Sequence, residues 1–207
     1  MLTARIASFI AEHALLTPGQ PVLVGFSGGA DSLCLIDVLR ELGYPVVAAH
    51  FNHYLRPEAA ADARRALAAA AALGVQATLG EGDERAYAQA HGHSLEEAAR
   101  ILRYRFLFAQ AEAGAAQAVA VGHTAGDQAE TVLMHFLRGA GLAGLRGMRP
   151  LTRLAVWSTS LPLVRPLLAI TRAETEAYCA ARGLTPLEAA SNRDPQFYRN
   201  RLRHALL

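Results

Sequence analysis

The stretch FSGGADSL, residues 26–33, joins two adjacent glycines to two serines and one aspartate at the point where an apolar run stops. Gly28 and Gly29 permit backbone torsions that turn N–H groups toward an anion, and a helix that follows adds its positive N-terminal dipole. The stretch is shorter than the GxxxxGK[ST] pattern and has no lysine. An acid beside phosphates requires a divalent cation between them, so Asp31 points to Mg2+. Two interpretations stay open: a phosphate-binding loop, or a Gly-Gly turn whose serine caps a helix.

A second polar stretch, HTAGDQAET at 123–131, contains two acids three positions apart. Asp127 and Glu130 would share one face of a helix, where neighbouring carboxylates repel each other and are stabilised by a cation. They suit Mg2+ or the ammonium groups of free lysine. The alternative is an ordinary acid pair in a first helical turn, which complements the helix dipole.

A third polar stretch, HFNHYLR at 50–56, also follows an apolar run. His50, Asn52 and His53 can reach a ligand there if the run is a strand of a parallel sheet. The alternative is that each histidine is a capped group of the core.

All 20 basic side chains other than histidine are arginines, because the sequence contains no lysine. A mechanism that needs a lysine of the protein, such as a Walker lysine or a Schiff base, is therefore excluded. Between Glu130 and Glu174 there are six arginines and no acid. Such a basic half suits a polyanion such as RNA, and the alternative is a solvated basic face.

Short apolar runs alternate with helical patterns, which predicts an α/β fold with a parallel, doubly wound sheet. The crossovers are right-handed, and helices cover both faces of the sheet. Ligands of such sheets bind at the carboxyl ends of the strands, so the three polar stretches are expected to converge. The expected strands are residues 21–26, 46–50, 75–79 and 118–121, and the expected helices are residues 31–42, 57–73, 94–113 and 127–137.

Both ends of the chain extend this core. Residues 1–16 are amphipathic and predict a helix. Beyond the fourth strand and its helix, the sequence predicts a glycine-rich loop, an edge strand at 154–158, a capped helix at 171–181 and a basic helical end. We therefore expect a catalytic domain at 1–150, and a basic helical extension of the same domain at 151–207.

Cys34 and Cys179 are the two cysteines, and no CxxC pattern is present. A disulfide framework or a cysteine metal site is not expected, so no disulfide partner is predicted. The longest apolar run, residues 66–73, is far shorter than a membrane span of about 20 residues. We expect a cytoplasmic chain with no membrane partner.

The polar stretches belong to a longer set of motifs that resembles a known family. A strand followed by SGGADS resembles the PP-loop ATP pyrophosphatases, and the later motifs resemble the tRNA(Ile)-lysidine synthetases of that superfamily. The resemblance covers roughly residues 21–205 in the same order, through HFNHYLRPEAAADA, EEAARILRYRFL, GHTAGDQAETVLMHFLRGAGLAGLRGM, RPLL, TRAETEAYC and SNRDPQFYRNRLRH. So many matches in one order make a chance match improbable. The resemblance implies a PP-loop fold of the adenine nucleotide alpha hydrolase type, with a short helical C-terminal extension.

The resemblance also implies roles for individual residues. Arg103 matches a family arginine that we assign to the ATP phosphates, because a guanidinium offers two donors to pyrophosphate, and a solvent-facing arginine is the alternative. The catalytic residues are then Asp31, Arg103, Asp127 and Glu130, with Asp31 and Asp127 as metal contacts. The nucleotide contacts are Ser27, Gly28, Gly29, Ala30, Asp31, Ser32, His50, Asn52, His53 and His123. The RNA or phosphate contacts are Arg138, Arg199, Arg201 and Arg203, for which a solvated helix face is the alternative.

The implied activity uses ATP and Mg2+ in two steps. The C2 carbonyl oxygen of the wobble cytidine of an isoleucine tRNA with a CAU anticodon attacks the α-phosphate of ATP, and pyrophosphate leaves. The ε-amino group of free lysine then attacks C2, AMP departs, and lysidine forms. The base must leave the anticodon stack, which fits recognition of an unpaired loop.

Two positions depart from the family pattern. Thr124 stands where a second histidine is common, and Gly126 where the first of two aspartates is common, while Asp127 and Glu130 stay in register. These changes motivate one alternative, a nucleotide-binding module without ligase activity. A PP-loop tRNA thiolase would need cysteine motifs that the chain lacks, and an ammonia-using ligase of the superfamily lacks the HxNHxLR and RGxGxxGLxGM stretches. A homodimer stays open. Lysidine synthetases usually carry further tRNA-binding domains, so we expect this chain alone to bind tRNA weakly.

Overall fold

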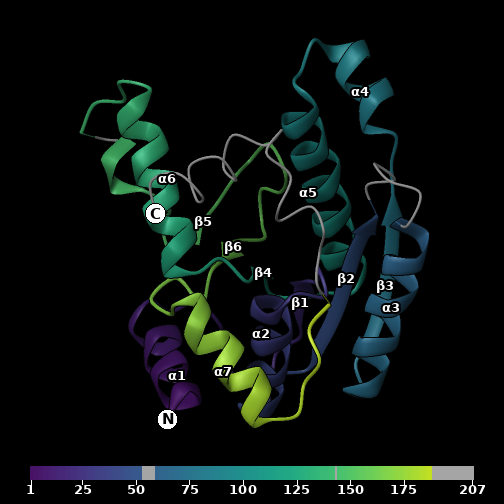
Figure 1. Cartoon of the computed structure of the whole chain (residues 1–207), viewed down its shortest axis with the longest axis vertical. Helices are drawn as coiled ribbons and strands as arrows, with labels where there is room; N and C mark the ends of the chain where they lie inside the picture. The colour runs from purple at the N-terminus through teal and green to yellow at the C-terminus, as the bar shows by residue number, and fades with distance from the viewer. Residues whose placement is uncertain (53–58, 143, 188–207) are drawn as a thin grey trace.

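The computed structural model describes residues 1–52, 59–142 and 144–187, and the chain is drawn in Figure 1. The strands are β1 (Val22–Gly25), β2 (Val46–Asn52), β3 (Gln76–Glu81), β4 (Val119–Val121), β5 (Leu151–Thr152) and β6 (Leu163–Val164). The helices are α1 (Leu2–Glu12), α2 (Ala30–Glu41), α3 (Ala59–Ala72), α4 (Glu84–His91), α5 (Leu95–Ala113), α6 (Ala125–Leu137) and α7 (Arg172–Ala181), with a 3-10 turn η1 (Gly144–Arg146).

The strands form one six-stranded sheet in the order β3-β2-β1-β4-β6-β5. All neighbours are parallel except β5, which runs antiparallel to β6. The predicted α/β fold is confirmed. The chain proceeds from β1 outward to β3 and then returns to the other side of β1 with β4. This reversal creates a topological switch point between β1 and β4, where α/β sheets bind ligands.

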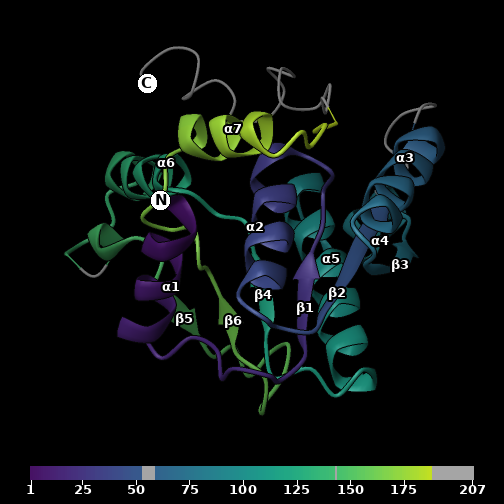
Figure 2. The ribbon, with the colours of Figure 1, turned by 90° about the horizontal axis from the view of Figure 1, so that it is seen from below.

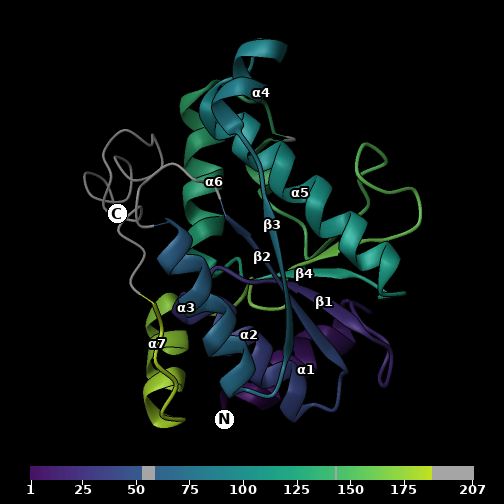
Figure 3. The ribbon, with the colours of Figure 1, turned by 90° about the vertical axis from the view of Figure 1, so that its right-hand side faces the viewer.

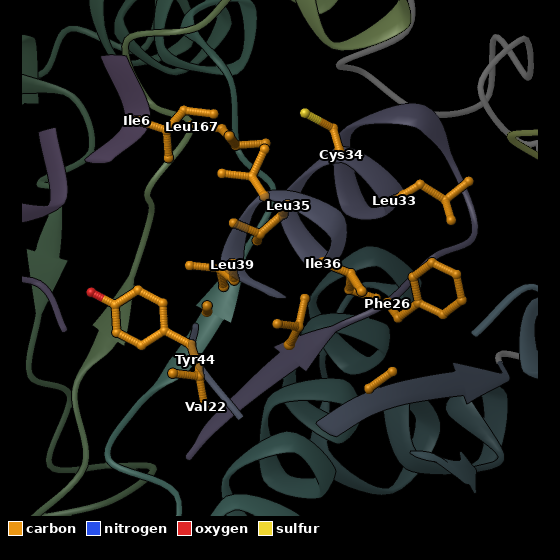
Figure 4. Packing of buried hydrophobic residues seen from close by; sticks show 14 of the residues in the cluster. Ile6, Val22, Phe26, Leu33, Cys34, Leu35, Ile36, Leu39, Tyr44 and Leu167 are labelled. Atoms are coloured by element: carbon orange, nitrogen blue, oxygen red, sulfur yellow. The ribbon is translucent and has the colours of Figure 1, made fainter. Parts of the chain in front are cut away.

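Helices cover both faces of the sheet, because alternate strand residues point to opposite sides. Val22 and Val24 of β1 pack in one core with α1, α2, α3 and α7, whereas Leu23 packs in a second core with α5. Figure 2 shows β1 between α2 and α5, and Figure 3 shows α3 and α5 on opposite sides of the β2–β3 edge. Figure 4 shows the first core, where Ile6 and Leu167 meet the leucines of α2.

The edge strand expected at 154–158 is wrong, and this segment forms a turn instead. The Ser158 hydroxyl donates to Glu112, and it accepts from the backbone N–H groups of Ser160 and Leu161. Trp157 packs beside Tyr104. The apolar run at 154–157 therefore belongs to a turn that Ser158 holds against α5, and the strands lie on either side of it as β5 and β6.

The sequence predicted none of α4, β5, β6 and η1. Helix α4 has Asp83 as its N-cap, whose carboxylate accepts from the Ala86 N–H, and Gly92 as its C-cap in a left-handed conformation. Strand β6 is only two residues long and fully buried, so it has no readable periodicity. The expected helix at the basic end of the chain lies outside the described residues. Within the described ranges, no helix has the length and hydropathy to span a bilayer.

Candidate active site

The loop between β1 and α2 is held by its two serines. The Ser27 backbone N–H donates to the Ser32 hydroxyl (3.3 Å), and that hydroxyl donates to the Gly29 carbonyl (3.0 Å). Gly28 has φ +85°, a left-handed value that favours glycine. Helix α2 is capped by Gly29 and not by a serine side chain. The N-terminal N–H groups of α2 therefore have no side-chain cap, which favours the phosphate-loop interpretation over the serine-capped turn.

Strand β4 ends directly against this loop. A Cβ atom at Gly122 would lie 3.1 to 3.2 Å from the backbone of Asp31 and Ser32, so a side chain there would push the loop away. The next residues, His123 and Thr124, are thereby carried to the first turn of α2. The predicted convergence of the first and fourth strand ends is confirmed by this contact.

The second strand end reaches the same loop. The Nδ1 atom of His50 lies 2.8 Å from the carbonyl oxygen of Phe26, and because a carbonyl only accepts, Nδ1 carries the proton. Asn52 is buried at the end of β2. His53, the third predicted residue of this stretch, lies outside the described residues.

Asp31 lies in the first turn of α2 and receives a hydrogen bond from the Thr175 hydroxyl of α7. Burial raises the pKa of Asp31, the Thr175 hydrogen bond and the nearby Arg172 charge oppose that rise, and the Asp127 charge adds to it. Asp31 and Asp127 are therefore close enough for their charges to interact. Arg172 donates to Glu176 on the same helix at 2.9 Å. The Arg172 charge lowers the pKa of Asp31, and the Glu176 charge raises it.

Asp127 caps its own helix. Its Oδ2 atom accepts from the backbone N–H (2.8 Å) and the hydroxyl (3.0 Å) of Thr124, which is buried. Thr124, one of the two departures from the family pattern, thus helps to orient Asp127. Glu130, one turn further, is only 2% exposed. The alternative of a helix-capping acid holds for Asp127, and its predicted metal contact stays a prediction.

A group of arginines lies around Tyr104 on α5. The guanidinium of Arg103 lies 5.1 Å from the Tyr104 ring centre, and that of Arg100 lies 5.8 Å from it. Arg165, just after β6, donates from Nε to Nδ1 of His123 at 3.2 Å. Burial lowers the pKa of Arg165, Tyr104 opposes this change, and the charge of Arg100 adds to it.

The glycine-rich segment after α6 is pinned to that helix. The side-chain amide of Gln128 donates to the Met148 carbonyl (3.1 Å) and accepts from the Met148 N–H (2.7 Å). His135 contacts the Gly144 carbonyl oxygen at 2.7 Å. Arg138, at the C-cap of α6, is exposed. The other predicted RNA contacts, Arg199, Arg201 and Arg203, lie outside the described residues.

Sequence reasoning missed three residues of this site: Arg165, Arg172 and Thr175. Arg165 and Arg172 stand in the stretch without acids, for which only a polyanion surface or a solvated basic face was considered. Thr175 is a fully buried polar residue in a helix whose apolar pattern gave no sign of it. Among the described residues, no three histidine, cysteine or acidic side chains are grouped to hold a metal ion.

Comparisons with known proteins agree with this geometry. Residues 2–207 match the model of a family described as PP-loop domain. The chain is 41% identical over 213 residues to the tRNA(Ile)-lysidine synthase of Dehalococcoides mccartyi, with 100% of this chain and 45% of that protein covered. It is 42% identical over 207 residues to that of Geobacter sulfurreducens, with 98% and 43% covered. The chain thus spans less than half the length of these relatives.

Solved structures share the fold. The U34-tRNA thiolase NcsA from Methanococcus maripaludis, solved with its [4Fe-4S] cluster, has a TM-score of 0.68 at 16% identity, covering 90% of this chain and 66% of that one. The NMN synthetase from Francisella tularensis has a TM-score of 0.61 at 14% identity, covering 88% and 70%. At these identities the likeness concerns the fold.

Proposed function

Since this chain belongs to the PP-loop domain family, we propose that it ligates free lysine to C2 of the wobble cytidine of an isoleucine tRNA with a CAU anticodon, at the expense of ATP. One observation carries the proposal: the phosphate loop, Asp31 and the start of α6 meet at the switch point of the sheet, in a chain 41% identical to a lysidine synthase. We place the activity in the cytoplasm, where tRNA, ATP and free lysine are present together. The comparisons give no support to a homodimer.

The phosphates of ATP would lie on the loop of residues 27–32. The uncapped N–H groups of α2 and its dipole supply hydrogen bonds and positive potential there. Arg172, whose charge acts on Asp31, would stabilise pyrophosphate as its charge develops, together with Arg103 beside Tyr104. A lysine plays this role in other phosphate loops. His50 and His123, each oriented by a hydrogen bond to a ring nitrogen, would contact the nucleotide.

Asp31 and Asp127 fit a hard divalent cation. Burial is the main cause of the raised pKa of Asp31, and the Asp127 charge adds to it, so a bound divalent cation would offset both effects. Mg2+ bound there would neutralise phosphate charge. The Thr175 hydroxyl and the Thr124 hydroxyl hold the two carboxylates in place.

Asp127 and Glu130 would receive the lysine substrate. The two acids lie three residues apart on α6, and Glu130 is buried. They can orient the ε-ammonium group and take its proton, so that the free amine attacks C2 and AMP leaves. Arg138 would contact phosphates of the RNA, together with Arg199, Arg201 and Arg203.

The cysteines disfavour a thiolase. Cys34 and Cys179 are both buried, burial raises the pKa of Cys179 to about 11, and it raises the pKa of Cys34 further. Buried neutral thiols are poor nucleophiles and poor ligands of a cluster. A nucleotide-binding module without ligase activity is the remaining rival.

Incubation with ATP, Mg2+, labelled lysine and a CAU-anticodon transcript of isoleucine tRNA tests the proposal. We expect label in the RNA, and a loss on the order of 100-fold with Asp31→Asn. Glu12→Gln, which changes an exposed acid at the end of α1, is the matched control and should retain activity. ATP binding without pyrophosphate release would identify the inactive module, and labelling that ignores the anticodon would contradict the substrate assignment.

A further inference from the structure

Arg165 is a buried cation without an acidic partner. It is 5% exposed, and no carboxylate forms an ion pair with it in the described part of the chain. Burying an unpaired charge is costly, so such a residue needs a function or full compensation by hydrogen bonds. Its neighbour Arg100 adds like charge and makes the position less favourable still.

The guanidinium of Arg165 connects three segments of the site. Nη1 donates to the Arg149 carbonyl (2.8 Å) and to the Thr152 hydroxyl (2.9 Å), while Nε donates to Nδ1 of His123 (3.2 Å). The Arg165 backbone N–H donates to the Pro150 carbonyl at 2.8 Å. Arg165 therefore links the end of the glycine-rich segment and β5 to His123, the second residue after β4.

The contact with His123 decides which ring nitrogen carries a proton. A guanidinium has donors and no acceptor, so Nδ1 of His123 must accept. The neutral ring then carries its proton on Nε2. His123 follows Gly122, which lies against Asp31 and Ser32, so the residue with this donor is next to the contact between β4 and the phosphate loop.

We propose that Arg165 is a positioning residue of the nucleotide site, which fixes the tautomer and ring orientation of His123 so that Nε2–H is its donor. The inference rests on the proposed function only for the identity of the ligand that this donor meets. A lysine could not replace Arg165, because a single ammonium group cannot hold the Arg149 carbonyl, Thr152 and His123 in one plane.

Nitrogen NMR of the chain labelled with 15N-histidine tests the tautomer directly. His123→Gln assigns the signals, and the spectra are recorded above the pH at which His123 loses its charge. The wild-type chain should show an unprotonated Nδ1 and a protonated Nε2. A proton on Nδ1 of His123 in the wild-type chain would overturn the proposal. This result needs neither a variant at Arg165 nor a measurement of enzyme activity.

Arg165→Met should release His123 into a mixture of tautomers. Arg153→Met is the matched control, because Arg153 also donates to a loop carbonyl, that of Ser160, yet does not bond His123. The control should leave the His123 signals unchanged. A loss of the single tautomer in both variants would assign the effect to the loop and would contradict a specific role of Arg165.

A double-mutant cycle on ATP–pyrophosphate exchange separates positioning from a structural role. Arg165→Met should lower kcat/KM by about 10-fold to 100-fold alone and by much less in the His123→Gln background, because the two residues act as a unit. Additive losses would overturn the proposal. Absence of exchange in the wild type, with the tautomer as stated, would instead contradict the proposed function.

Discussion

Asp31 and Thr175 are joined by a hydrogen bond between α2 and α7. They are 144 residues apart in the chain, and the Thr175 hydroxyl, fully buried, donates to the Asp31 carboxylate. Helix α7 is fixed against α2 by Asp37, which accepts from Tyr178 (2.8 Å) and from Arg182 (2.9 Å). The orientation of Asp31 therefore depends on the packing of α7.

Thr175→Val tests this dependence. Valine has nearly the same shape and lacks the hydroxyl, so the carboxylate of Asp31 loses its fixed rotamer. We expect binding of Mg2+-ATP to weaken by about 10-fold, the equivalent of one hydrogen bond to a charged group. Titration calorimetry measures the affinity.

Thr175→Ser is the control for this change. It keeps the hydroxyl and removes one buried methyl group, so it should cost about 1 kcal/mol of unfolding free energy and leave the affinity near that of the wild type. Equal affinities of the valine and serine variants would show that Thr175 does not orient Asp31.

At the scale of elements, the glycine-rich segment is positioned by α6. Gln128 holds Met148 by two hydrogen bonds, and Gly147 beside it has φ +62°. A Cβ at Gly147 would lie 2.7 Å from the Gln128 side chain. The segment leads to β5 and to Arg149, so its position also affects Arg165.

Gly147→Ala should therefore lower the free energy of unfolding by more than the cost of placing an alanine at a positive φ. A left-handed alanine costs about 1 kcal/mol, and the displaced Gln128 adds about 1 to 3 kcal/mol. Gly183→Ala is the control, because Gly183 has φ +65° and nothing within 4 Å of the added Cβ. Chemical denaturation measures both variants, and equal losses would contradict the contact with Gln128.

At the scale of the molecule, charge is divided along the chain. Residues 1–130 contain 9 arginines and 14 acids, whereas residues 131–207 contain 11 arginines and 4 acids. Figure 1 shows α6 and η1 projecting away from the sheet, and exposed Arg138 and Arg146 lie there. This end of the molecule suits the phosphates of RNA.

We expect tRNA affinity to fall as salt rises, because each arginine–phosphate contact releases counterions. Arg138→Gln should weaken binding and reduce the slope of log affinity against log salt by about 1. Arg5→Gln, whose arginine pairs with Glu174 on α7, should leave the slope unchanged. Fluorescence anisotropy with the 207-residue chain over a salt series measures this. A slope near zero would contradict the assignment of this surface to RNA.

The sequence by itself determined the alternation of strands and helices and the place of the polar stretches. Strands β1, β2 and β4 end at Gly25, Asn52 and Val121, close to the ends that the apolar runs in the sequence predicted. Two adjacent glycines and flanking serines indicated a candidate phosphate loop at 27–32, although these residues alone left a serine-capped turn open. The same local reasoning failed at 154–158, where side-chain bonds to α5 turn the chain.

Only the tertiary structure decided which distant side chains meet. The bonds from Thr175 to Asp31 and from Arg165 to His123 join residues 144 and 42 positions apart. No sequence spacing or periodicity predicts either pair, because each depends on how two elements pack in the folded chain. The helix cap that Thr124 and Asp127 form also became visible only with coordinates. Features that depend on a few consecutive residues can be predicted from the sequence. The orientation of the Asp31 carboxylate or the His123 imidazole is instead fixed by neighbours that folding brings together.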